Sequence, residues 1–259
     1  MAEANNSINQ NNMLVKIRSK YIVIKIFENL KENRLLKLIH YNKKYQKLMN
    51  KKIFDYQKAF SKIVIEIIPK ENVYGIFINN IYCKSIKSNV EIYFNDDKKE
   101  IKRESITQND NVKKIRIIIN HKIKTLYRFF SNCVCIKKIS FIKFNKNDIT
   151  NMSYMFNGCS NLEEINFDKF NTNNVFNMGG MFDDCSSLKE LNLSNFNTSK
   201  VKYMYHMFKG CSKLKELNLS NFNTNNLFSA YYMFKGCSSL VSLICTNDLI
   251  KNEFSRKLN

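Results

Sequence analysis

Cysteine is the residue with chemical potential whose spacing in this sequence is most regular. Five of the eight cysteines stand 26 residues apart without interruption: Cys133, Cys159, Cys185, Cys211 and Cys237. Stacked repeats bring equivalent cysteines close to disulfide distance, so pairing is geometrically allowed. A lone buried thiol in each repeat is the more common outcome, because free cysteine behaves as a small apolar side chain. We therefore expect a ladder of buried thiols.

The other candidates for catalysis or metal binding form no recognisable motif. Cys133 and Cys135 are closely spaced, but no second cysteine pair or histidine accompanies them, which disfavours a zinc site. The three histidines, His40, His121 and His206, are isolated from one another in the sequence. No nucleophile–base pair, phosphate-binding glycine loop or acidic cluster of catalytic spacing is visible. We therefore expect a protein that is not an enzyme, with no catalytic residue, no metal site and no cofactor.

The cysteines belong to a longer repeat, because apolar residues recur with the same 26-residue period. Phenylalanine stands three residues before each cysteine, and isoleucine or leucine stands three residues after it: Phe130, Phe156, Phe182, Phe208, Phe234, and Ile136, Leu162, Leu188, Leu214, Leu240. Two more apolar columns follow: Ile139, Ile165, Leu191, Leu217, Leu243, and Phe141, Phe167, Leu193, Leu219, with Ile244 or Cys245 in the last unit. One such unit cannot bury its own apolar face, so the repeat indicates a stack of units.

Each unit changes its apolar spacing half-way. In the segment 188–193, Leu191 and Leu193 alternate with polar residues at spacing two, which predicts a short strand. Val175, Met178, Met181 and Phe182 follow a helical stripe, which predicts a short helical segment. The residue before each cysteine is asparagine, glycine or aspartate. All three tolerate positive φ, so we expect this residue to end the helical turn.

The repeat resembles the leucine-rich repeats of the BspA-like type, which occur in bacterial and protist surface proteins. The resemblance is carried by motifs such as Asn195-Phe196-Asn197-Thr198 and Met207-Phe208-Lys209-Gly210-Cys211-Ser212-Lys213-Leu214, and it covers residues 127–243. It implies adhesion or host-surface interaction. A degenerate unit extends the repeat to about residue 112, with Ile115, Ile117, Ile123 and Leu126 one period before Phe141, Lys143, Ile149 and Met152.

The expected fold is therefore α/β. It is a leucine-rich-repeat solenoid of about five to six 26-residue rungs, in which a ladder of parallel strands alternates with short helical turns. A helical and small-sheet cap precedes it. The expected domains are an N-terminal region at 1–111, the solenoid at 112–250 and a polar C-terminal tail at 251–259.

The N-terminal region does not repeat. Two or three helices are expected between residues 13 and 60, and strands at 62–69, 73–79 and 90–95. The pattern Ile26-Phe27-x-x-Leu30, Leu35-Leu36-x-Leu38-Ile39 and Tyr41-Asn42-Lys43-Lys44-Tyr45 is similar to an F-box, which implies a substrate adaptor of a ubiquitin ligase. The leading proline and the tryptophan of that pattern are missing. A plain N-terminal cap is the alternative.

The best candidates for binding are the polar residues between the inward leucines of each strand. They are Glu164, Asn166, Asp168, Glu190, Asn192, Ser194, Glu216, Asn218 and Ser220. Three glutamates in one column repel one another at rung spacing. A basic or hydrogen-bonding partner, or a cation, would relieve this repulsion, and so would solvent together with Lys189 and Lys215. The expected function is a non-catalytic scaffold that binds a protein partner of unknown identity through this face.

Charge and composition restrict the partner and the compartment. The net charge is +20, yet no basic–aromatic block or helix-turn-helix pattern accompanies it, which disfavours nucleic acid. The sequence shows no transmembrane segment and no signal peptide. A cytoplasmic location is therefore expected, with the cell surface as the alternative that the family resemblance implies.

Overall fold

The computed structural model describes residues 62–79, 89–120, 123–144, 146 and 148–257. The chain divides into two compact units, 1–61 and 62–259, and the description below concerns the second. The helices expected between residues 13 and 60, and with them the F-box-like pattern, lie outside the described residues. Within the described residues the structure consists of strands and turns, with one helix.

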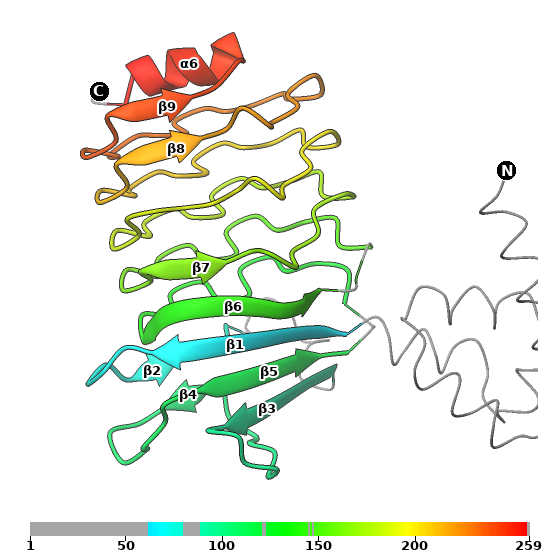
Figure 1. The fold of residues 1–259 in the computed structure, drawn as a ribbon, viewed down its shortest axis with the longest axis vertical. Helices are drawn as coiled ribbons and strands as arrows, with labels where there is room; N and C mark the ends of the chain where they lie inside the picture. Colours follow the sequence, from blue (N-terminus) through cyan, green and yellow to red (C-terminus); the bar gives the residue numbers. More distant parts are fainter. Residues whose placement is uncertain (1–61, 80–88, 121–122, 145, 147, 258–259) are drawn as a thin grey trace, which may run out of the picture. The chain divides into compact units, whose positions relative to one another are not determined.

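A mixed five-stranded sheet, ordered β3-β5-β1-β6-β7, forms one end of this unit (Figure 1). Its strands are β1 (Ile63–Pro69), β3 (Val90–Phe94), β5 (Ile115–Ile119), β6 (Ile136–Phe144) and β7 (Glu164–Asn166). Strand β1 runs antiparallel to β5 and to β6, whereas β6 and β7 are parallel. Strands β2 (Gly75–Ile76) and β4 (Ser105–Ile106) pair separately.

The sheet confirms the strands expected at 62–69 and 90–95, while the strand expected at 73–79 shortens to β2. The expected repeat unit that begins near residue 112 is correct only in its second half: Thr125 bridges Asn151 in parallel, and Ile123 and Leu126 are buried, but the strand of the unit does not join the repeat. Strand β5 lies antiparallel between β3 and β1 instead of parallel beside β6. Its alternation of buried isoleucines suits any half-buried strand, so the apolar spacing could not distinguish the two arrangements.

From residue 125 onward the chain winds in coils of 26 residues, a coil being one repeat unit. Parallel bridges join equivalent residues of successive coils: Thr125 to Asn151, Asn151 to Asn177, Asn177 to Tyr203, and Tyr203 to Ser229. Strands β8 (Glu216–Asn218) and β9 (Ser242–Ile244) pair in parallel in the last two coils. The segment 190–193 follows the same path without strand hydrogen bonding.

The half of each coil that was expected to be helical consists of turns, so this prediction is wrong. Its backbone N–H groups bond alternately within and between coils. Met181 N–H donates to the Met178 carbonyl oxygen at 3.2 Å, and Phe182 N–H donates to Met207 of the next coil at 2.9 Å. Apolar residues at helical spacing also fit successive turns. In the stack, N–H groups that would bond within a helix donate to carbonyl oxygens of the next coil.

The residue before each repeat cysteine has positive φ, as the sequence predicted: Asn132, Gly158, Asp184, Gly210 and Gly236. A second column with positive φ was not foreseen. It lies four residues earlier and consists of Arg128, Tyr154, Gly180, His206 and Tyr232. Two left-handed residues in each coil bend the chain repeatedly and prevent a continuous helix.

Phenylalanine rings form a stack through the core. Phe130, Phe156, Phe182, Phe208 and Phe234 are fully buried, and their ring centroids are 5.6 to 5.8 Å apart with planes within 8° of parallel. The isoleucine or leucine that stands three residues after each repeat cysteine is buried as well, and so are the methionines of the turns. Each coil therefore buries its apolar residues against its neighbours, as a unit too small to hold its own core must.

Helix α6 (Asp248–Ser255) covers the last coil, so the polar tail expected at 251–259 is wrong in part. Asn247 caps its N-terminus by accepting a hydrogen bond from Ile250 N–H. Ile250 is fully buried, and the ring of Phe254 meets that of Phe234 edge-on with centroids 5.9 Å apart. A helix that closes the open end keeps the core out of water.

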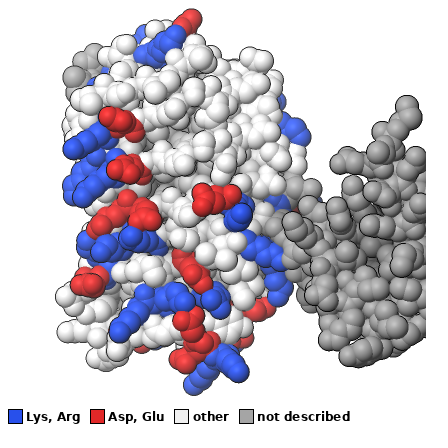
Figure 2. Space-filling view, in the orientation of Figure 1, with Lys and Arg blue, Asp and Glu red and all other residues white. Residues whose placement is uncertain are grey.

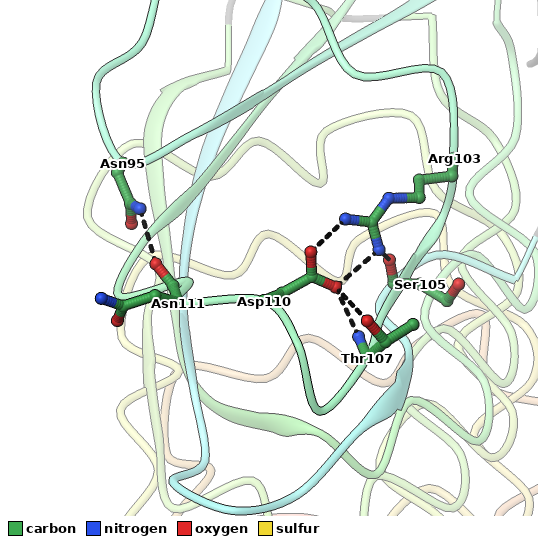
Figure 3. A network of polar contacts seen from close by, with 6 residues as sticks. All are labelled: Asn95, Arg103, Ser105, Thr107, Asp110 and Asn111. Atoms are coloured by element: carbon green, nitrogen blue, oxygen red, sulfur yellow. Dashed lines mark hydrogen bonds and ion pairs between the residues drawn. The ribbon is translucent and has the colours of Figure 1, made fainter.

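The loop between β4 and β5 is held by one carboxylate (Figure 3). Asp110 accepts two hydrogen bonds from the guanidinium of Arg103 and two from Thr107, through the backbone N–H and the hydroxyl, each of the latter at 2.7 Å. Hydrogen bonds from Arg103 and Thr107 hold the pKa of Asp110 well below its usual range. A carboxylate with four donors fixes the loop in one conformation.

Candidate functional site

The repeat cysteines form an inter-coil hydrogen-bond ladder and do not form a reactive site. The Cys159, Cys185, Cys211 and Cys237 thiols each donate to the phenylalanine carbonyl oxygen of the preceding coil, at 2.9 to 3.1 Å. All five repeat cysteines are free and buried. Burial raises the pKa of these thiols, to about 12 for Cys159 and Cys237. The thiols therefore stay protonated at neutral pH, a state that suits packing and not nucleophilic attack.

The nine polar residues expected on the outside of the strands are all exposed. We call the surface that they form the strand face: Glu164, Asn166, Asp168, Glu190, Asn192, Ser194, Glu216, Asn218 and Ser220. Parallel pairing places equivalent residues of adjacent coils side by side, for example Glu216 beside Ser242. Acidic and basic side chains lie next to one another along one edge of the molecule, beside a broad uncharged area (Figure 2).

The glutamates of the strand face differ in their ion pairing. Glu164 pairs with Lys138 of the preceding coil. Its neighbour Glu163, just outside the strand face, pairs with Lys70 of the segment after β1 at 2.5 Å, and this contact lowers the pKa of Glu163. Within the part of the chain that the structure describes, Glu190 and Glu216 make no salt bridge. These two carboxylates are therefore available to a partner.

The asparagines of the strand face have a structural role of their own. The side-chain oxygens of Asn166, Asn192 and Asn218 accept the backbone N–H two residues further on, at 2.8 to 3.0 Å. Such a turn ends the extended segment and fixes the orientation of the amide. The amide N–H₂ of Asn166 also donates to Asp168 at 3.2 Å. Amides held in this way present hydrogen-bond donors without further loss of side-chain entropy.

Next to the strand face, a second asparagine column, Asn171, Asn197 and Asn223, makes the same local turn. Threonine makes contacts between coils: the Thr172 hydroxyl donates to the Asn197 carbonyl oxygen at 3.0 Å, and Thr198 donates to Asn223 at 2.9 Å. The side-chain amide of Asn197 adds one more, to Asn173 at 3.1 Å. Both threonines are buried. These residues therefore hold the coils in register.

Sequence reasoning missed the aromatic side chains on the turn half of the coils. Tyrosines, His206 and Phe228 follow one another there in ring contact. They occupy several different repeat positions, and Gly179 and Gly180 interrupt the sequence pattern, so no single column revealed them. His206, to which the sequence analysis assigned no function, is one member of this series. Desolvation lowers its pKa.

The described residues contain no group of three or more histidine, cysteine, aspartate or glutamate side chains placed to hold a metal ion. In the same residues, no helix combines the length and the apolar character that a bilayer-crossing segment needs.

Comparison with known proteins gives two similarities. A family model described as "Mycoplasma protein of unknown function, DUF285" matches residues 124–246, just under half of the chain. Among solved structures, a leucine-rich repeat protein from Bacteroides ovatus is similar at 21% sequence identity with a TM-score of 0.32. That match covers 53% of this chain but only 37% of the Bacteroides protein. No curated protein matches.

Proposed function

We propose that this chain is a leucine-rich-repeat solenoid that acts as a non-catalytic scaffold and binds a protein partner through the strand face. The observation that carries the proposal is the repetition of exposed polar residues over buried apolar ones in successive coils. Core packing accounts for Leu217 and its equivalents, which are buried or, in two coils, partly buried. It does not account for the glutamate and asparagine columns outside them.

Two features of the strand face support recognition of a protein. The side chains of Glu190 and Glu216 are exposed and offer charged acceptors in adjacent coils. Beside them, Asn192 and Asn218 offer amide donors whose orientation is fixed by local turns. Preorganised donors and acceptors lose little entropy on binding, which suits a repeated and extended interface. The partner would carry basic and hydrogen-bonding groups at a matching spacing.

Charge reversal on the strand face tests the proposal. The double variant Glu190→Lys and Glu216→Lys, and a control with Glu71→Lys and Asp97→Lys, carry the same net charge change on exposed carboxylates. Each protein is immobilised and exposed to native lysate, and retained proteins are quantified by mass spectrometry. We expect a set of proteins that wild type and control retain and that the strand-face variant loses by at least tenfold. Equal retention by all three folded proteins would remove the proposal.

A further inference from the structure

The turn half of the coils carries a continuous series of aromatic side chains that the core does not need. We call it the aromatic strip: Tyr127, Tyr154, Tyr203, Tyr205, His206, Phe228, Tyr231 and Tyr232. Ring contacts with centroids 3.8 to 6.5 Å apart link all eight members. Every member is at least partly exposed. Exposed apolar side chains that form a continuous patch are typical of binding surfaces.

Two glycines make the strip continuous. A Cβ atom at Gly179 would lie 2.5 Å from the ring of Tyr205, and one at Gly180 would lie 2.3 Å from the ring of Tyr154. The tyrosines of the neighbouring coils therefore lean into the space that these glycines leave, and their ring centroids come to 6.2 Å. The coil that contains the two glycines has no aromatic residue of its own in the strip, and Tyr154 and Tyr205 from the coils before and after it meet across that position.

The strip is most exposed at the last coil. Phe228 is 78% exposed and Tyr231 is 55% exposed, which is unusual for side chains of this size in a folded protein. Buried tyrosine and phenylalanine anchors dominate the energetics of protein–protein interfaces. These two side chains are therefore the natural anchors of the strip.

Cations flank the rings. The guanidinium of Arg128 lies 4.8 Å from the ring centroid of Tyr154, and the ammonium of Lys235 lies 4.6 Å from that of Tyr232. Lys202 is exposed in the same series of coils, and its carbonyl oxygen accepts the N–H of Phe228. Two carboxylates lie nearby, and both are paired: Asp183 is buried against Lys209 at 3.2 Å, and Glu253 accepts the N–H of Tyr232 at 2.8 Å and pairs with Arg256 at 3.5 Å. The strip therefore presents apolar rings with positive charge at their edge.

We propose that the aromatic strip binds an acidic, extended peptide segment of a partner protein whose apolar side chains dock on Phe228 and Tyr231. Charge complementarity selects the acidic partner, because the flanking side chains are cationic. Nucleic acid also is anionic, but base stacking needs free ring faces. The cations and neighbouring rings occupy faces of Tyr154, Tyr232 and His206. Four coil spacings of roughly 4.8 Å match about six extended residues.

Fluorescence anisotropy with labelled probes of about ten residues tests this proposal. The first probe alternates glutamate and phenylalanine, the second alternates glutamine and phenylalanine, the third contains glutamate and serine, and the fourth is oligothymidine. We expect the first probe to bind at least tenfold more tightly than the other three. Added salt should weaken this binding, because rim charges contribute to it. Equal or tighter binding of any other probe would overturn the proposal.

Variants locate the binding. Phe228→Ser with Tyr231→Ser should weaken binding of the first probe at least tenfold, while Tyr74→Ser, an exposed tyrosine on another part of the unit, should leave it unchanged. Lys202→Glu with Lys235→Glu provides a second test that keeps the rings. If all folded variants bind as wild type does, the strip is not the site. A wild-type dimer in sedimentation that Phe228→Ser dissolves would show instead that a second copy covers the strip, and would also overturn the proposal.

Discussion

The Cys185 thiol donates a hydrogen bond to the carbonyl oxygen of Phe156, 29 residues earlier and one coil away, at 3.1 Å. The same contact recurs at Cys159, Cys211 and Cys237. It explains why this column is cysteine and not alanine or valine. Cysteine fills a small apolar space and at the same time gives a buried carbonyl oxygen, which already accepts one backbone N–H of its own coil, a second donor from the next coil.

The first prediction follows from this contact. We expect Cys185→Ala to lower the free energy of unfolding by about 1 to 3 kcal/mol, because it removes one of the two donors to the Phe156 carbonyl oxygen, which keeps the N–H of Cys159, and opens a small cavity. Urea denaturation followed by circular dichroism measures the change. A loss below a few tenths of a kcal/mol would show that the thiol contributes neither packing nor a hydrogen bond.

Thiol reactivity gives a second prediction. Cys185 is fully buried and its pKa is raised by burial, whereas Cys245 is half-buried. We expect a thiol reagent at neutral pH to modify Cys245 in the native protein at least a hundredfold faster than Cys185. Peptide mapping by mass spectrometry distinguishes the two sites. Equal rates in the absence of denaturant would contradict the buried ladder.

Core packing gives a third prediction, in which two equivalent leucines differ. Leu217 is 3% exposed, whereas Leu191, one coil earlier, is only partly buried. We expect Leu217→Ala to cost about 2 to 5 kcal/mol through cavity formation. Leu191→Ala should cost less, because part of its side chain already contacts water. The repeat pattern alone predicts the same burial for both leucines. Equal losses in the free energy of unfolding would therefore agree with that pattern and contradict the difference in burial.

The glycine pair gives a fourth prediction. Gly180 has a φ of +62° as well as the Tyr154 ring against it, whereas Gly179 meets only the ring of Tyr205. We expect Gly180→Ala to destabilise the protein by roughly 1 to 2 kcal/mol more than Gly179→Ala, because the left-handed backbone is strained for alanine. Thermal denaturation of the two variants measures this difference. No difference would mean that the backbone at residue 180 is not left-handed.

The loop carboxylate gives a prediction for pH. The pKa of Asp110 is lowered in the folded state, chiefly by the hydrogen bonds from Arg103. The stabilisation is therefore fully present above the unfolded-state pKa of about 3.9 and is lost progressively as pH falls from there through the lower folded-state pKa. We expect Asp110→Asn to reduce the melting temperature clearly at pH 6 and by a smaller amount at pH 2.5, which lies between the unfolded-state and folded-state pKa values. The same reduction at both values would show that ionisation of Asp110 contributes nothing.

The sequence could predict the 26-residue period, the buried columns and the exposed strand face, because each depends on spacing within one repeat. It could not predict the path of the turn half. Met178 and Met181 fit a helix or successive turns equally, and the choice depends on N–H groups that bond to the next coil. It also could not predict the aromatic strip, where Tyr154 and Tyr205 meet across a pair of glycines. Contacts between coils decide both features.

The central claim is that successive 26-residue coils lie in register, so that the strand face is one continuous surface. Cysteines introduced in adjacent coils, Asn192→Cys with Asn218→Cys, should form an intramolecular disulfide on mild oxidation, because neighbouring parallel strands lie within disulfide reach. The same test with Asn166→Cys and Asn218→Cys, two coils apart, should give none. Mass spectrometry of the cross-linked peptides decides between them. Absence of the adjacent-coil disulfide, or formation of the distant one instead, would contradict the account.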